Sequence, residues 1–478
     1  MDLERKAISA LKWTAAARLL GQLASWLITL VVIRILDPGD YGLMAMTAAA
    51  VSLAAAVAEF GLGPSIVQRQ ALPDETLRKL VGFSILLHLV LAVVVASVAP
   101  VMAWYFGDAR LAPLVRFAAL HFVFAALAAA PHALAMRSLD FKLLAQVDLG
   151  SGLFASVVSL ALALADAGAW ALVGAAVAGA ALRAGLLAIG GDKVRPDFRF
   201  VGMAADLKYS STLATSHILW SALNQCDAII GGRILSREAL GTYSVALNLA
   251  LLPMNKILGV INQVAFSAVA RLQDEAERLQ LRLLQSLRLL AASGIAMLWG
   301  LTAVAPELVR SVLGAKWEAA ILPLQLIGLI VPFRLVMALL STAVAGIGRA
   351  DVSLRNTVTA AIIWPLCFLL GAQFGATGLA AAWLGAVPLS FAFNSRRVVR
   401  ALGFGITRLA RCVAGSVVAG TIMLAAVAGA RAAAADLSDV VRLGVLIAVG
   451  AAVYLVVLVA LDRELVSDAR RLLAAAKT

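Results

Sequence analysis

A short motif occurs twice in this chain, once in each half. Arg34-Ile35-Leu36 is followed after five residues by Gly42, and Arg233-Ile234-Leu235 is followed after five residues by Gly241. Each copy comes after a long apolar stretch with polar residues along one helical face. A duplication on this scale predicts two structurally similar halves, an arrangement typical of membrane transporters that move about a central site.

The composition identifies the solvent in which the chain folds. Of its 478 residues, 62% are hydrophobic and 14% are charged, and the mean hydropathy is +0.95. Because no soluble fold buries so large an apolar fraction, we predict an all-α polytopic membrane protein. About fourteen stretches are apolar enough to cross a bilayer as helices of roughly 20 residues. They cover residues 13–35, 42–62, 80–106, 113–135, 143–166, 168–189, 209–232, 239–262, 287–309, 323–345, 353–374, 375–394, 410–430 and 440–461.

Together with the duplication, these stretches predict two parallel six-helix repeats followed by two additional helices. The expected transmembrane halves are residues 1–200, with helices 1–6, and residues 201–400, with helices 7–12. Residues 401–478 then hold helices 13–14 and a cytoplasmic tail.

The formal net charge of +13 is explained by topology. When both termini are placed in the cytoplasm, Lys and Arg fall about three to one on the cytoplasmic side, as the positive-inside rule requires. The basic residues are scattered over short loops without interleaved aromatics, which argues against nucleic-acid binding.

Several chemistries lack the residues they need. The loops leave no room for an extramembrane catalytic domain, and no Gly-rich phosphate loop is present, so we expect no catalytic residues. Cys226, Cys367 and Cys412 lie in or beside apolar stretches without paired spacing, so they are predicted to be small core residues. We expect no metal and no cofactor.

Two polar stripes open the two halves. Aligning the motif copies pairs three residues of the first helix with three of the seventh, at i, i+4 and i+7 in each. These are Arg18, Gln22 and Ser25, and His217, Ser221 and Asn224. Hydrocarbon penalises such stripes, so we expect them to face the space between the halves.

Basic residues inside the predicted spans are candidates for binding an anion. Arg334 falls near the midplane beside Pro332, where a lumenal role or an ion pair is expected. Lys256 follows Asn255 on a polar face that serves either inter-helix hydrogen bonding or a sugar- or phosphate-binding wall. Arg183 lies about one turn from a helix end, where snorkelling explains it.

Acidic residues and histidines inside the spans are fewer. Glu59, Asp148, Asp227 and Glu307 either pair with a basic neighbour or couple transport to protons or sodium. Asp227 is the sharper coupling candidate because Asn224 and Gln225 precede it, and Glu59 is the second. His88, His121 and His132 are scattered through the sequence and are predicted to be structural.

At this point the chain resembles a known family. The relevant segments are Arg34 to Leu43, Glu59 to Gly63 with Ile66 to Arg69, Asp227 to Gly232, Leu240 to Ser244, Arg271 to Gln273 and Gly314 to Trp317. They are similar to the Wzx-type polysaccharide flippases of the multidrug/oligosaccharidyl-lipid/polysaccharide exporter superfamily, in the colanic-acid-exporter-like branch. The resemblance implies an inner-membrane flippase that moves undecaprenyl-diphosphate-linked oligosaccharide to the periplasmic leaflet by alternating access. It also implies contacts with membrane lipids and with the polysaccharide polymerase and export machinery.

These observations lead to one set of expected site residues. Substrate binding is assigned to Arg18, Gln22, Ser25, His217, Ser221, Asn224, Asn255, Lys256 and Arg334, and ion coupling to Asp227 and Glu59. The alternative is a multidrug or other lipid-linked-precursor exporter, for which an acidic, aromatic-rich lumen is expected, whereas 6% of this chain is aromatic. A membrane glycan polymerase or ligase is disfavoured by the short outer loops.

Overall fold

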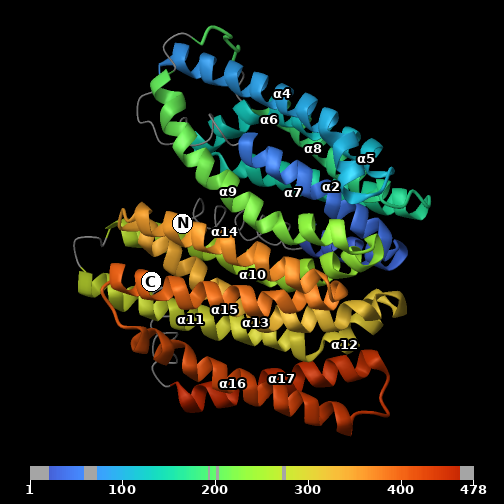
Figure 1. The fold of residues 1–478 in the computed structure, drawn as a ribbon, viewed down its shortest axis with the longest axis vertical. Helices are drawn as coiled ribbons and strands as arrows, with labels where there is room; N and C mark the ends of the chain where they lie inside the picture. Colours follow the sequence, from blue (N-terminus) through green and yellow to red (C-terminus); the bar gives the residue numbers. More distant parts are fainter. Residues whose placement is uncertain (1–20, 59–72, 192–193, 201–203, 272–275, 463–478) are drawn as a thin grey trace, which may run out of the picture. The chain divides into compact units, whose positions relative to one another are not determined.

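The computed structural model describes most of the chain. It covers residues 21–58, 73–191, 194–200, 204–271 and 276–462, and within these ranges the side chains of 204–217, 255–271, 276–277 and 350 are not described. Over this part of the chain the structure is helical and contains no strand (Figure 1). Eleven of the described helices are long and apolar enough to cross a membrane. The all-α class is therefore confirmed, while the count of about fourteen spans stays a prediction.

The chain divides into two compact units, which meet in sequence at Gly241 and Thr242. The first unit includes α9, because α9 packs along α2. This grouping differs from the expected boundary at residue 200, where α9 would open the second half. The boundaries 1–200, 201–400 and 401–478 describe the sequence repeat and stay a prediction.

The first unit is a bundle of long apolar helices. They are Gly21–Ile35, α2 (Pro38–Ala58), α4 (Asp74–Phe106), α5 (Leu111–Ala118), α6 (Leu120–Arg137), α7 (Phe141–Leu164), α8 (Trp170–Gly190) and α9 (Ala204–Ile234). Local signals set their ends. α4 stops at Gly107, whose φ of 74° is the left-handed conformation that closes a helix. α7 starts after Asp140, whose carboxylate accepts the backbone N–H of Leu143 at 3.0 Å.

The two copies of the repeated motif touch each other within this unit. Gly42 is the fifth residue of α2, and Gly241 is the fifth residue of α10 (Arg237–Arg271), the helix whose first turn closes the unit. A Cβ on Gly42 would lie 2.0 Å from the carbonyl oxygen of Arg237, and one on Gly241 would lie 1.6 Å from that of Pro38. Pro38 and Arg237 occupy equivalent positions in the two copies. The duplicated glycines therefore permit a reciprocal backbone contact.

The second unit contains the remaining helices. They are the rest of α10, α11 (Ala276–Ala303), α12 (Ala305–Leu308), α13 (Ile321–Gly346), α14 (Ala350–Ala372), α15 (Gly375–Ala401), α16 (Ile406–Ala433) and α17 (Asp439–Leu461). Trp299 of α11 and Met423 and Tyr454 of the α16–α17 hairpin share one buried cluster. The hydroxyl of Tyr454 donates to the carbonyl of Ala292 at 2.8 Å, which fixes the hairpin against α11.

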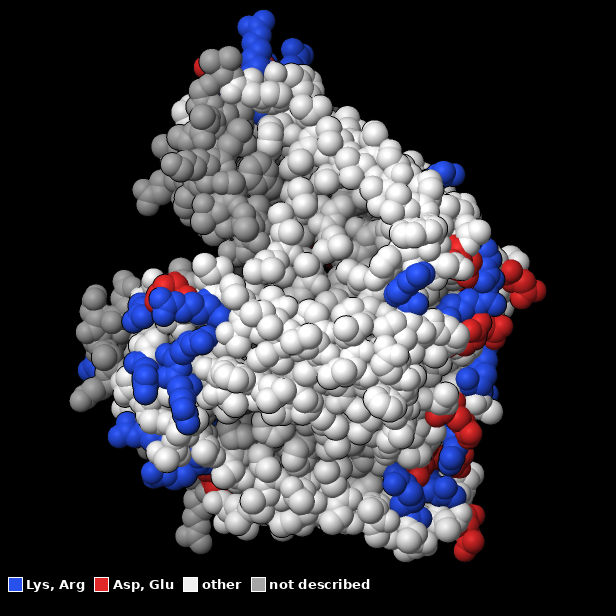
Figure 2. Space-filling view, in the orientation of Figure 1, with Lys and Arg blue, Asp and Glu red and all other residues white. Residues whose placement is uncertain are grey.

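On the face of the second unit seen in Figure 2, charged side chains lie at the ends of the helices, and the surface between these ends is largely free of charge. One end joins the start of α14, the end of α15 and the start of α16, and its exposed basic residues are Arg349, Arg355, Arg396, Arg397, Arg400, Arg408 and Arg411. The opposite end mixes Arg310, Arg431 and Arg442 with acidic partners. An apolar belt between charged ends is the pattern expected of helices that cross a bilayer.

Two of the three cysteines, Cys226 and Cys412, are buried, and Cys367 is partly buried. The burial of Cys226 and Cys412 agrees with the prediction that they are small core residues.

Candidate functional site

Arg334 lies near the middle of α13, held against two aromatic rings of the same unit. Its guanidinium carbon is 4.5 Å from the ring centroid of Trp383 on α15 and 5.2 Å from that of Trp364 on α14. Both distances are within the range of an attractive cation–π contact. We call Arg334, Trp364 and Trp383, with Tyr243 and Ser390 that hold the two rings, the arginine cage.

The rings of the cage are fixed by their own hydrogen bonds. The indole N–H of Trp383 donates to the hydroxyl of Tyr243 at 2.8 Å, and that of Trp364 donates to the hydroxyl of Ser390 at 3.0 Å. Tyr243 and Trp383 are almost fully buried. Phe368 packs edge-on against both indoles, with centroids 5.0 Å from Trp383 and 6.4 Å from Trp364. Because buried rings with satisfied N–H groups have little freedom, they hold the guanidinium at a fixed depth.

The sequence supports this geometry locally. Pro332 stands inside α13, and since proline has no N–H, the carbonyl one turn earlier lacks its usual helical donor. A Cβ on Gly328 would lie 2.3 Å from the Thr302 hydroxyl oxygen, so glycine lets α11 approach α13 closely. Sequence reasoning identified Arg334 but not its aromatic partners. The available signal was that Trp364 and Trp383 lie within membrane-length helices rather than at their ends, where tryptophan is usually enriched.

The predicted stripe residues that the structure describes have partners within the first unit. The Ser25 and Ser156 hydroxyls are 2.5 Å apart, which joins the first helix to α7. Ser221 donates to the carbonyl of Ser52 at 3.2 Å, and Asn224 donates to the carbonyl of Trp220 at 2.8 Å. Gln22 is half-buried. That these side chains face a common cavity stays a prediction.

The remaining candidates are described in part. Asp227 is buried in the first unit, with 2% of its surface exposed, and its carboxylate accepts the backbone N–H of Ala228 at 2.8 Å. Five predicted site residues have no described side chain: Arg18 and Glu59 lie outside the described residues, as do the side chains of His217, Asn255 and Lys256.

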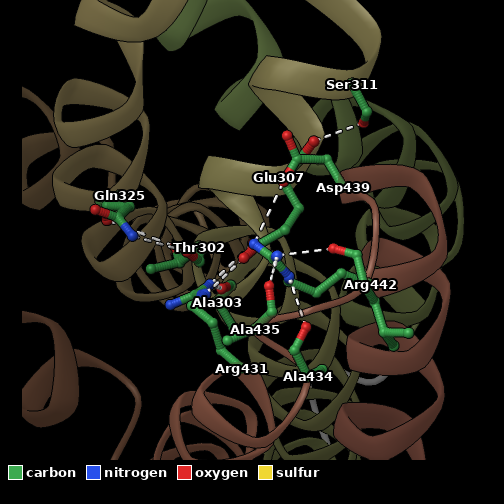
Figure 3. A network of polar contacts seen from close by, with 11 residues as sticks. Thr302, Ala303, Glu307, Ser311, Gln325, Arg431, Ala434, Ala435, Asp439 and Arg442 are labelled. Carbon is green, nitrogen blue, oxygen red and sulfur yellow. Dashed lines mark hydrogen bonds and ion pairs between the residues drawn. The ribbon is translucent and has the colours of Figure 1, made fainter.

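For Asp148 and Glu307 the sequence left two roles open, pairing with a basic residue or ion coupling. Both residues form ion pairs. Asp148 lies 2.7 Å from Arg183. Arg183, whose position in the sequence was explained by snorkelling, thus has a carboxylate partner. Glu307 is 1% exposed, and both its oxygens accept from Arg431, at 2.7 and 3.0 Å (Figure 3). Bidentate geometry of this kind is strong and directional.

The Glu307–Arg431 pair belongs to a larger network at one end of the second unit. Arg431 also donates to the carbonyl of Ala303, and the Ser311 hydroxyl donates to the Glu307 carbonyl (Figure 3). Arg442 donates to the carbonyls of Ala434 and Ala435 at the end of α16, at 3.0 and 2.6 Å. The network thus ties α12 to the α16–α17 hairpin. Similar depth and opposite charge were the only sequence signals for the central pair.

Exposed ion pairs cap the helices outside the spans. Arg110 donates to Asp108 at 2.6 Å in the turn after α4, and this hydrogen bond raises the pKa of Arg110. The pair is solvent-accessible, so its contribution to stability is small.

Long apolar helices, one of them with a partly buried arginine near its middle, define a multi-pass membrane protein. The chain belongs to the polysaccharide biosynthesis protein family, whose sequence pattern matches residues 31–322. It is 27% identical over 395 residues to the lipopolysaccharide biosynthesis protein WzxC of Escherichia coli (strain K12), covering 80% of this chain and 79% of that protein. It is 25% identical over 338 residues to the teichuronic acid biosynthesis protein TuaB of Bacillus subtilis (strain 168), covering 69% of each. The predicted Wzx-type resemblance is confirmed.

Solved structures share the fold at low sequence identity. The lipid II flippase MurJ in an inward closed conformation superposes with a TM-score of 0.74 at 12% identity, covering 94% of this chain and 100% of that one. An inward-facing multidrug resistance MATE family transporter of the MOP superfamily gives a TM-score of 0.62 at 15% identity, covering 80% and 95%. The fold is therefore the one found in a lipid II flippase and in a multidrug resistance MATE family transporter.

Proposed function

We propose that this protein is a flippase for undecaprenyl-diphosphate-linked oligosaccharides. It moves these units from the cytoplasmic to the periplasmic leaflet of a bacterial inner membrane by alternating access, with both termini in the cytoplasm. Relatives named for lipopolysaccharide, teichuronic acid and amylovoran biosynthesis support a polysaccharide precursor as the substrate class. The polymerase and export machinery of that polysaccharide are the proposed protein partners.

The observation that carries the proposal is the arginine cage. The diphosphate of a lipid-linked sugar needs a cation where the bilayer offers no water. Arg334 is near the middle of a membrane-length helix, and the cage keeps its position fixed. A guanidinium stacks through its face and donates through its edge, so the aromatic contacts are compatible with phosphate binding.

The other site residues enter the proposal with defined roles. We propose that the two polar stripes line the substrate path: Arg18, Gln22 and Ser25 in one, and His217, Ser221 and Asn224 in the other. Asn255 and Lys256 form a sugar- or phosphate-binding wall in this proposal. Asp227 and Glu59 are proposed to couple transport to a proton or sodium gradient. A multidrug exporter shares this fold, but a central arginine disfavours a cationic ligand.

The test replaces Arg334 and measures polysaccharide export and membrane abundance. Arg334→Ala should reduce export at least tenfold, since losing a charged phosphate contact costs about 1.5–3 kcal/mol, and Arg334→Lys should restore part of the activity. Arg349→Ala is the matched control, because Arg349 is exposed at a helix end and pairs with Asp351. Full export by Arg334→Ala at normal abundance contradicts the proposal.

A further inference from the structure

Three of the four histidines in the chain line one cavity of the first unit. This cavity, of about 580 Å³, lies among α4, α6, α7 and α8, and His88, His121 and His132 form part of its wall. His121 and His132 share α6, about three turns apart, and the fold brings His88 of α4 to the same cavity. We call this cavity the histidine chamber.

An ion pair completes the charged lining of the chamber. Asp148 on α7 and Arg183 on α8 lie 2.7 Å apart in the same wall. The other lining residues are Ser151, glycines and alanines. The helices α2, α5 and α9 also pack against this group, but they contribute no residue to the lining. Among the described residues, the three imidazoles, one carboxylate and one guanidinium are therefore the titratable and charged groups that line the chamber.

The chamber runs inward from one end of the helices. At about 1.5 Å per residue, His132 lies about 8 Å before the end of α6, and Asp148 and Arg183 lie about 10 Å from the ends of α7 and α8 on that side. His88 is about 21 Å from the start of α4 at the same end, and His121 is about 24 Å from the end of α6. Protonatable groups thus extend from near the helix ends to the middle of the bundle.

The chemistry of these groups favours a proton over other ligands. Imidazole is the side chain that gains and loses a proton most readily near neutral pH. Among the described residues, no three His, Cys, Asp or Glu side chains are close enough to hold a metal ion. An anion is disfavoured because Asp148 already offsets the charge of Arg183.

Hydrogen bonding fixes where the proton binds on His88. Its Nδ1 is 2.8 Å from the carbonyl oxygen of Ser84. Since a carbonyl can only accept, Nδ1 carries the hydrogen, and Nε2 is the acceptor atom of the neutral ring. A proton added at Nε2 makes His88 an imidazolium with two donors.

We infer that the histidine chamber is a proton-binding site in the first unit, with His88, His121 and His132 as the proton acceptors. A charged imidazolium there is repelled by Arg183 and attracted by Asp148, so it competes with Arg183 for the carboxylate. Proton binding and the Asp148–Arg183 pair are therefore linked. This assignment is separate from the coupling proposed for Asp227 and Glu59. Of the two experiments below, only the transport measurement rests on the proposed function.

The first experiment measures proton binding without transport. The full-length protein, labelled with ¹⁵N-histidine and placed in nanodiscs, contains four imidazoles, and single His→Gln variants assign their signals. The three chamber histidines should titrate between pH 5 and 8. Asp148→Asn should move at least one midpoint by about one pH unit, a tenfold change in proton affinity. Asp108→Asn, which removes a carboxylate outside the chamber, should move none.

Two results would overturn the inference: imidazoles that do not titrate in this range, or midpoints that are insensitive to Asp148→Asn. If Asp148→Asn fails to fold, Arg183→Gln replaces it. Removing the guanidinium that repels an imidazolium should raise at least one midpoint by about one pH unit, and unchanged midpoints would again overturn the inference.

The second experiment follows movement of the lipid-linked oligosaccharide in inverted vesicles at equal pH on both sides. The wild-type rate should change several-fold between pH 5.5 and 8, and His88→Gln, His121→Gln and His132→Gln should each flatten that profile. A variant profile identical to the wild-type profile contradicts a role for the chamber in transport. An absence of any transport by the wild type would instead contradict the proposed function, while the titration still decides the chamber.

Discussion

Replacing Gly241 or Gly42 by alanine should destabilise the first unit. The added Cβ would lie 1.6 Å from the Pro38 carbonyl oxygen in the first case and 2.0 Å from the Arg237 carbonyl oxygen in the second. Ordinary C···O contacts are about 3.3 Å or longer, so the backbones must separate by about 1.3 to 1.7 Å. Because both obstacles are backbone atoms, no side-chain rotation can relieve the overlap.

The expected magnitude follows from two opposing effects. Overpacking of a tight contact costs about 1–3 kcal/mol, and alanine regains up to about 1 kcal/mol over glycine in a helix. Each substitution should therefore cost about 1–2 kcal/mol net. For a unit of this size, each kcal/mol lowers the melting temperature by about 2–4 °C, so the expected loss is about 2–8 °C.

The assay is thermal unfolding of the purified protein in detergent, with Gly185→Ala as the matched control. Gly185 lies inside α8 of the same unit, and a Cβ there would meet nothing within 4 Å. The control should melt at or above the wild-type temperature. The double variant Gly42→Ala/Gly241→Ala should lose less than the sum of the single losses, because one separation of the helices relieves both contacts. Strictly additive losses, or singles that match the control, would refute the reciprocal contact.

Two further predictions concern buried carboxylates. Glu307→Gln should lower the unfolding free energy by about 2–4 kcal/mol, because it leaves Arg431 partly buried without its counter-charge. Adding Arg431→Gln should recover part of this loss in the same melting assay, and equal losses in the single and double variants would contradict the pairing. Asp227→Asn should flatten the response of transport to an imposed ion gradient while leaving substrate binding intact, and an unchanged gradient response would assign Asp227 to structure.

The helical class and the depth of key residues could be predicted from the sequence, since both depend on local patterns. Apolar length identifies a membrane helix, and position within that length places Arg334 near the middle. The partners of these residues could not be predicted in the same way. The Trp383–Tyr243 hydrogen bond joins residues 140 positions apart, and periodicity gives the face of a helix but not the helix opposite.

The histidines show the same limit in a sharper form. His121 and His132 share α6, but no pattern in the sequence links them to His88 on α4, so the sequence alone favoured a structural role for each. Their shared cavity depends on how α4 and α6 pack with α7 and α8. The grouping of α9 with the first unit is another packing result, because the repeat marks equivalent helices without saying which neighbour each one contacts.

The reciprocal glycine contact also separates the role of the repeated motif from that of the stripes before it. In an isologous contact, residue i of one copy meets residue j of the other and the reverse, so both copies must carry the same small residue. Gly42 against Arg237 and Gly241 against Pro38 have this form. The two glycines of the motif are thereby explained by packing. The stripes have no such explanation in common, because Ser25 bonds to Ser156 on α7 whereas its counterpart Asn224 bonds to Trp220 within α9. Differences between the two halves in substrate recognition are therefore to be sought in the stripes rather than in the motif.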